Sequence, residues 1–233
     1  MKRACIAGSL AMLVAGCGGS TQGAVDSAAA LQARQLRISD VPAAFYLEKR
    51  YRLPADQTAQ WQHIDRSQYM QRGGRASLSE SYVLRHPVAA GVTFIFSQLI
   101  AFTSASGARW GFQQLRAALA HSGTIGTDQE YVNVLATPTP LPTIIAIIKH
   151  PLPPPITRYE PTRAPPLGDE DAGFTNTSAA YAGEYVFTNQ VVLFRRGRYC
   201  GVVHTSGNYG QVPMSTALAL ARRIDLHIRE AKT

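Results

Sequence analysis

The sequence predicts an α+β fold in which amphipathic helices pack on a mainly antiparallel β-sheet. Residues 91–104 and 181–207 contain long runs of β-branched and aromatic residues, which favour strands. Residues 108–119 and 217–228 repeat apolar residues every three or four positions, which indicates helices with one buried face. Because the sheet and the helices each have an apolar side to cover, packing the helices on the sheet satisfies both.

The first part of the chain is expected to hold two short helices and three strands. Asp26 or Ser27 would cap the first helix. Asp56 would cap the second, which Gly73-Gly74 would end. The expected helices cover residues 25–36 and 56–69, and the expected strands cover residues 46–53, 76–86 and 91–104.

A longer amphipathic helix is expected to follow these strands, over residues 104–123. Ser104 or Ser106 is its expected cap, and Gly123 would close it. Its apolar stripe consists of Ala108, Phe112, Leu115 and Leu119.

The last third of the chain predicts a β-hairpin followed by a helix. Residues 195–198 form the expected turn, in which Gly197 can take a positive φ and the arginines are exposed to solvent. The helix is expected over residues 213–231, with Pro213 near its first turn. Since each half of the chain places strands before a helix, the order also suggests a ββα duplication. The stripe of the last helix consists of Ala217, Leu220, Ala221, Ile224 and Ile228.

A proline-rich stretch separates the two halves. Ten of the 14 prolines fall between Pro138 and Pro166, and proline supplies no amide donor to a central strand or helix. We therefore expect a long extended loop at about 136–166. The apolar residues 143–149 within it are read as an edge strand that must be covered, because an exposed apolar β-prone segment aggregates.

The start of the chain has the features of a bacterial secretion signal. Lys2 and Arg3 precede an apolar run that is too short to span a membrane. The stretch Leu13-Val14-Ala15-Gly16-Cys17 resembles the lipobox of bacterial lipoproteins. The resemblance implies cleavage before Cys17, a diacylglycerol thioether on its sulfur and a fatty acid such as palmitate on its new amine. The alternative is an ordinary secretion signal in which Cys17 is incidental.

These features divide the chain into a signal peptide, residues 1–16, a flexible tether, residues 17–23, and a single α+β domain, residues 24–233. Removing 16 of 233 residues leaves 217, enough for one ordinary core.

Lys2 and Arg3 leave with the signal, so the net charge falls from +8 to +6. The arginines are dispersed, so we predict no nucleic-acid partner. The expected partners are the membrane, through the anchor, and an envelope lipid, polymer or protein.

The cysteines allow no disulfide within the processed chain. Cys5 leaves with the signal and Cys17 carries lipid, so Cys200 remains alone. It is interpreted as a small buried hydrophobe, with a reactive or intermolecular thiol as the alternative. Cys200 and His204 share one face of a strand but lie roughly 13 Å apart at that spacing, which disfavours a catalytic dyad.

No motif indicates a catalytic residue, a cofactor or a metal site. The six histidines are scattered, and none pairs with a neighbour at metal-ligand spacing. Asp169-Glu170-Asp171 is interpreted as a solvated turn, with a calcium site as the alternative. Three aromatic residues could stack on a sugar or an apolar ligand. They are Trp110, which is expected in the core or at its margin, Trp61, which is the better surface candidate, and Tyr69.

The sequence thus predicts an envelope lipoprotein, anchored by lipid on the extracytoplasmic side of a bacterial membrane, that acts as a non-catalytic binding module. A pocket between sheet and helices is expected to be lined by Phe94, Phe96 and Phe112. Two alternatives stay open. One is a hydrolase-type enzyme with a dispersed site, and the other is a sensor or assembly lipoprotein that contacts a protein partner.

Overall fold

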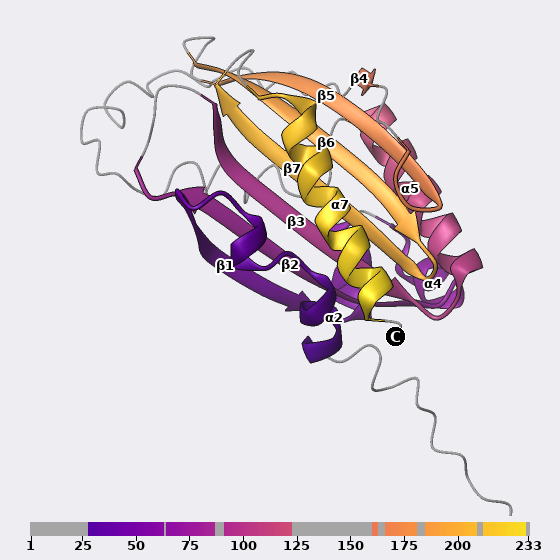
Figure 1. The fold of residues 1–233 in the computed structure, drawn as a ribbon. Helices are drawn as coiled ribbons and strands as arrows, with labels where there is room; N and C mark the ends of the chain where they lie inside the picture. The colour runs from indigo at the N-terminus through magenta and orange to yellow at the C-terminus, as the bar shows by residue number, and fades with distance from the viewer. Residues whose placement is uncertain are drawn as a thin grey trace, which may run out of the picture.

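A seven-stranded antiparallel sheet forms the centre of the molecule, in the strand order β1-β2-β3-β7-β6-β5-β4 (Figure 1). The computed structural model describes residues 28–62, 64–86, 91–122, 160–162, 166–180, 185–208 and 212–231. The strands are β1 (Phe45–Leu53), β2 (Gly74–Leu84), β3 (Val92–Phe102), β4 (Glu160–Thr162), β5 (Glu170–Ala180), β6 (Tyr185–Arg196) and β7 (Tyr199–Asn208). The predicted α+β fold is confirmed.

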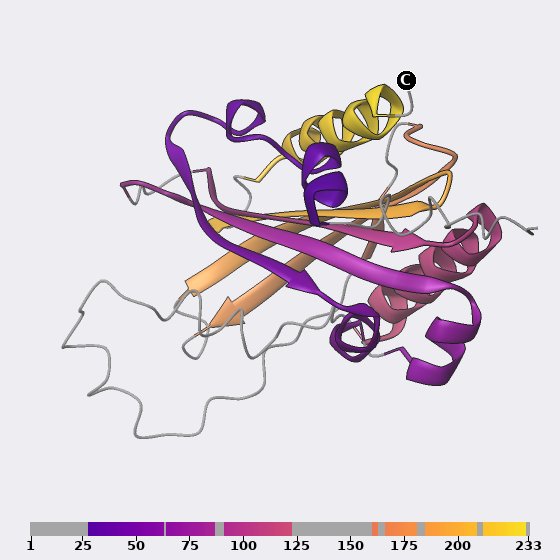
Figure 2. The same ribbon diagram turned by 90° about the horizontal axis from the view of Figure 1, so that it is seen from below.

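Helices cover both faces of this sheet (Figure 2). One apolar cluster joins α7 and α2 to one face, and a second joins α5, α3 and α4 to the opposite face. No described helix is both long enough and apolar enough to cross a membrane. The helices are α2 (Ala28–Arg34), the 3-10 turn η1 (Ile38–Asp40), α3 (Ala55–Trp61), α4 (Arg66–Gln71), α5 (Ala105–Ser122) and α7 (Met214–Glu230).

The pairing of β3 with β7 joins the two halves of the chain at the centre of the sheet. Phe96 lies opposite His204, and Gln98 lies opposite Val202. Because side chains alternate between the faces of a strand, all four project toward the α5 side. In this register, the side chains of β7 lie in the same cross-strand rows as those of β2 and β3.

The two long helices and the hairpin turn form as predicted. Every residue of the two predicted stripes is buried against the sheet. Ser104 caps α5, because its Oγ accepts a hydrogen bond from the Gly107 amide at 3.1 Å. Gly197 takes the positive φ, 57°, that the β6–β7 turn requires.

The helix predicted over residues 56–69 is wrong as a single element. The chain forms two short helices instead, α3 and α4, and the predicted cap Asp56 lies inside the first turn of α3. Asp65 caps α4, since its carboxylate accepts from the Gln68 amide at 2.7 Å. A second capping aspartate inside the run offers the backbone a new start, which is why one helix becomes two.

Several predictions lie partly or wholly outside the described residues. The signal peptide, Cys17, the tether 17–23 and the apolar residues 143–149 are among them. Within the described part of the proline-rich stretch, Glu160–Thr162 forms β4 at the edge of the sheet, where Pro161 is tolerated. The ββα duplication stays a prediction, and α5 and α7 lie on opposite faces of the sheet.

Candidate functional site

The sheet face that carries α5 changes from apolar to polar along its strands. Val191 and Phe174 belong to the apolar cluster under α5. Asn189 and Asn176 lie two residues further along the same strands, where they form a cross-strand pair. Both asparagines are buried although they lie beyond that cluster. Buried polar side chains of this kind need hydrogen-bond partners, which makes this end of the face the first candidate site.

A ladder of three side chains crosses β7, β6 and β5 at this end. His204 Nε2 lies 3.1 Å from Asn189 Oδ1, and Asn189 Nδ2 donates to Asn176 Oδ1 at 3.1 Å. Asn176 is 2% exposed, and its Nδ2 has no hydrogen-bond partner in the described part of the chain. The ladder therefore ends in a buried N–H group that is free to meet an acceptor.

The ladder carries no charge at neutral pH. Burial lowers the pKa of His204 to about 3, so the imidazole is neutral near pH 7. The two asparagines cannot ionise. A charged ligand would lose its hydration here without gaining a counter-charge, so the arrangement suits an uncharged ligand.

The three phenylalanines predicted to line a pocket are divided between two environments. Phe112 packs in the apolar cluster under α5. Phe94 and Phe96 are also buried, but they belong to neither apolar cluster of the described residues. The Phe94 ring meets the His204 ring edge-on, with centroids 6.5 Å apart. Phe112 is thus a core residue, and the other two accompany the ladder.

Cys200 is the buried hydrophobe that the sequence predicted. Its thiol donates a hydrogen bond to the Ala108 carbonyl at 3.0 Å, and burial raises its pKa far above the ordinary value. A thiol in this state is neither ionised nor directed at His204, whose Nε2 faces Asn189. The arrangement gives no support to a thiol–imidazole dyad.

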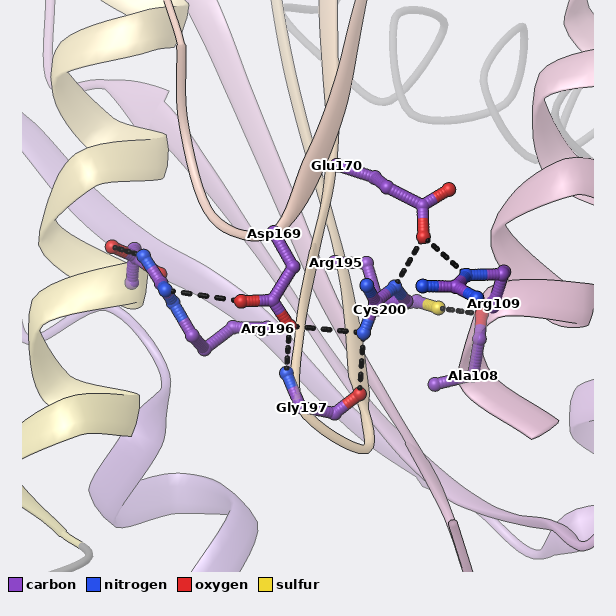
Figure 3. A network of polar contacts seen from close by, with 9 residues as sticks. Ala108, Arg109, Asp169, Glu170, Arg195, Arg196, Gly197 and Cys200 are labelled. Carbon is purple, nitrogen blue, oxygen red and sulfur yellow. Dashed lines mark hydrogen bonds and ion pairs between the residues drawn. The ribbon is translucent and has the colours of Figure 1, made fainter. Parts of the chain in front are cut away.

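The hairpin turn at residues 195–198 takes part in an ion-pair network that is partly buried (Figure 3). Arg195 contacts Asp169 at 2.9 Å and Glu170 at 2.8 Å, and its side chain is only 5% exposed. Arg196 contacts Asp169 at 3.1 Å and Asp225 of α7 at 2.7 Å. The prediction that the arginines of the turn are exposed is therefore wrong for Arg195, while Arg196 and Arg198 are partly buried. The cause is the register of Arg195 and Arg196, which places them beside the acidic start of β5.

The same contacts bear on the alternative that Asp169-Glu170-Asp171 binds calcium. Glu170 accepts hydrogen bonds from Arg109 of α5 and from Arg195. Partial burial alone would raise the pKa of Glu170, but these two hydrogen bonds and the charges of the two arginines together lower it. The described residues contain no group of three side chains placed to hold a metal ion. Asp169 and Glu170 instead connect the turn to α5 and α7.

The three aromatic residues predicted as ligand contacts occupy different environments in the structure. Tyr69 is fully buried, and its hydroxyl donates to the Arg75 carbonyl at 2.7 Å, so it is part of the core. Trp110 packs at the margin of the apolar cluster, as predicted, beneath the Arg72 guanidinium. Trp61 is half-buried at the end of α3 and meets Tyr51 edge-on at 6.0 Å. Trp61 alone remains a candidate for a ligand contact.

Sequence reasoning missed both asparagines of the ladder. A signal was present, because Phe-Thr-Asn occurs twice, at residues 174–176 and 187–189. Asparagine is depleted in strands. Two copies of the same tripeptide in neighbouring strand-forming runs could therefore have indicated a paired polar feature on one face.

The fold and the ladder define this chain as an α+β domain with an uncharged polar site on a largely buried sheet face. No family model and no curated protein matches it. Among solved structures, the fold is similar to that of the extracellular domain of PknH from Mycobacterium tuberculosis, with a TM-score of 0.53. The two sequences are 13% identical over 88% of this chain and 97% of that one. At this identity the similarity concerns the fold alone.

Proposed function

We propose that this protein is a non-catalytic binding module, held by a lipid on Cys17 at the extracytoplasmic side of a bacterial membrane. The lipobox-like stretch that ends at Cys17 supports the anchor. The fold similarity to an extracellular domain supports the location. Asn176 Nδ2, which has no hydrogen-bond partner among the described residues and ends a buried neutral ladder, carries the binding function.

The physical basis is the cost of leaving that amide unpaired. A buried donor without a partner costs about 1–3 kcal/mol. A ligand oxygen that accepts this hydrogen bond recovers the cost only in the complex. Phe94 and Phe96 add apolar surface to the same end of the face. The ligand class that fits is an uncharged envelope molecule that combines a hydroxyl or carbonyl oxygen with an apolar part.

The side-chain amide of Asn176 is the most direct reporter of binding. The ¹⁵N-labelled protein is titrated with neutral and with anionic lipid fractions extracted from a bacterial envelope. We expect the neutral fraction to shift the Asn176 Nδ2 resonances and to raise the melting temperature. Asn176→Leu should lose the rise in melting temperature, while Gln113→Leu, which replaces an exposed amide on α5, should keep it. A response to the anionic fraction alone, or to neither, would contradict the proposal.

A separate experiment tests the anchor. Cells that express the wild-type protein are compared with cells that express Cys17→Ser, and both are grown with a labelled fatty acid. The wild-type protein should carry the label and fractionate with membranes, whereas the variant should be unlabelled and leave the membrane fraction. An unlabelled wild-type protein rules out the lipid anchor without affecting the ladder.

A further inference from the structure

We infer that a second ligand site, for an uncharged amide-bearing sugar, lies where α3 ends over β1 and β2. Three buried polar atoms of this region have no hydrogen-bond partner in the described part of the chain. They are the indole Nε1 of Trp61, the side-chain oxygen of Gln62 and the hydroxyl of Ser79. They lie on elements other than those that carry the His204 ladder.

The register of the sheet places the residues that carry these three atoms beside one another. Ser79 of β2 lies between Tyr51 of β1 and Gln98 of β3 in one cross-strand row. The Trp61 ring packs edge-on against Tyr51, and Gln62 Nε2 donates to Gln98 Oε1 at 2.5 Å. Trp61 and Gln62, at the end of α3, therefore contact Tyr51 and Gln98, the two cross-strand neighbours of Ser79.

The neighbouring polar side chains have hydrogen-bond partners, so the lack of partners at the three atoms is a local feature. Ser77, the next residue of β2 on this face, pairs with Thr58 at 3.0 Å and accepts from Gln98 Nε2 at 3.3 Å. Exchanging oxygen and nitrogen in both amides leaves one amide atom of Gln62 unpaired as before. An unmet group thus persists at Gln62 in either orientation.

The chemistry of the unpaired atoms selects the ligand class. The indole N–H is a donor, the amide oxygen is an acceptor, and the serine hydroxyl can act as either. None of the three carries a charge, so the complementary ligand is neutral and presents both donors and acceptors. Aromatic rings beside such groups can stack on the apolar face of a sugar ring. A sugar with hydroxyl and N-acetyl groups matches this set.

This site is distinct from the ladder at His204. Ser79 lies on β2 and Asn189 on β6, three strands apart in the sheet order. At a strand spacing of about 4.8 Å, that is roughly 14 Å across the sheet. Each site can therefore be removed while the other is kept.

The test uses the mature lipidated protein in detergent micelles, with triacetylchitotriose as the probe and maltotriose, which lacks amides, as its control. We expect triacetylchitotriose to shift the Trp61 Nε1–H resonance and to bind measurably by calorimetry, and maltotriose to do neither. Trp61→Phe keeps an aromatic ring and removes the donor, so it should weaken binding about tenfold, as the loss of one hydrogen bond would. Ser79→Ala should have a similar effect.

Two controls keep the inference falsifiable. Trp110→Phe and Asn176→Leu should bind the probe as the wild-type protein does, and thermal unfolding verifies that each variant is folded. Absence of binding at millimolar concentrations would mean that ordered solvent alone satisfies the three atoms, which overturns the inference. Equal binding by Trp61→Phe, or loss of binding in Asn176→Leu, would place the sugar elsewhere and overturn it as well.

Discussion

Ser77 and Ser79 lie two residues apart on the same face of β2 and are equally buried, yet only Ser77 has hydrogen-bond partners among the described residues. Thr58 and Gln98 contact the Ser77 hydroxyl, whereas no described residue forms a hydrogen bond with the Ser79 hydroxyl. The strand, the face and the burial are the same for both residues. Comparing substitutions at the two serines therefore isolates the effect of an unpaired hydroxyl on stability from the other effects of burial.

Ser79→Ala should leave the free energy of unfolding unchanged or raise it by about 1 kcal/mol, because it removes a buried hydroxyl that makes no hydrogen bond to the described residues. Ser77→Ala should lower it by about 1–2 kcal/mol, since it leaves the Gln98 amide without that partner. Urea denaturation of both variants measures the difference. An equal loss in the two would mean that the Ser79 hydroxyl is satisfied in solution, contrary to the structure.

Acid should destabilise the fold through His204. Its pKa is near 6.5 in the unfolded chain and about 3 in the folded protein. Between these values the unfolded chain binds a proton that the folded protein does not, so stability falls as the pH drops below 6.5. Melting temperatures between pH 7.5 and 5, where carboxylates stay ionised, should fall less in His204→Gln than in the wild-type protein. His86→Gln, at an exposed histidine, is the control and should retain the wild-type slope. Parallel slopes in all three proteins would refute this role.

Arg195 should be the most costly residue of the turn to replace. Arg195→Met removes a buried cation and leaves Asp169 and Glu170 without their shared partner. Breaking a fully buried pair costs about 3–5 kcal/mol. These carboxylates are partly solvated, so we expect about 2–3 kcal/mol. Arg116→Met, at an exposed position of α5, should change the free energy by less than about 0.5 kcal/mol. A similar small effect at Arg195 would show that the network contributes little.

The same network implies a dependence on acid that differs from that of His204. The pKa of Glu170 is lowered in the folded protein. Its contribution is therefore complete above its unfolded pKa, near 4.5, and is lost as the pH falls through the lower folded value. The stability gap between the wild-type protein and Arg195→Met should accordingly shrink below pH 4.

The fold was predictable where its signal is local and periodic. The stripes of α5 and α7 and the glycine of the β6–β7 turn are visible within short windows of sequence, and the structure confirms them. The break between α3 and α4 was missed, because Asp65 competes with Asp56 as a cap within a stretch that contains no proline or glycine. Propensity alone does not decide between two capping aspartates.

The site was hidden for a different reason, since it depends on register across strands. Arg195 is buried because it lies opposite Glu170, which is 25 positions earlier in the chain. Asn176 and Asn189 meet because β5 and β6 pair in one particular alignment. A shift of one residue would move every one of these side chains to the other face. Only the repeated Phe-Thr-Asn tripeptide hinted at that alignment.

Cys200 should resist thiol reagents until the protein unfolds. Burial raises its pKa, and its thiol donates to the Ala108 carbonyl, so the reactive thiolate is both scarce and inaccessible. In a chain carrying Cys5→Ser and Cys17→Ser, labelling with iodoacetamide should be on the order of 10³-fold slower in buffer than in urea. Ser67→Cys, at an exposed position of α4, provides the matched control and should label quickly in both. Rapid labelling of Cys200 in the folded protein would show that α5 separates readily from the sheet. The apolar cluster beneath α5 could then not be the rigid support that the ladder of His204, Asn189 and Asn176 needs.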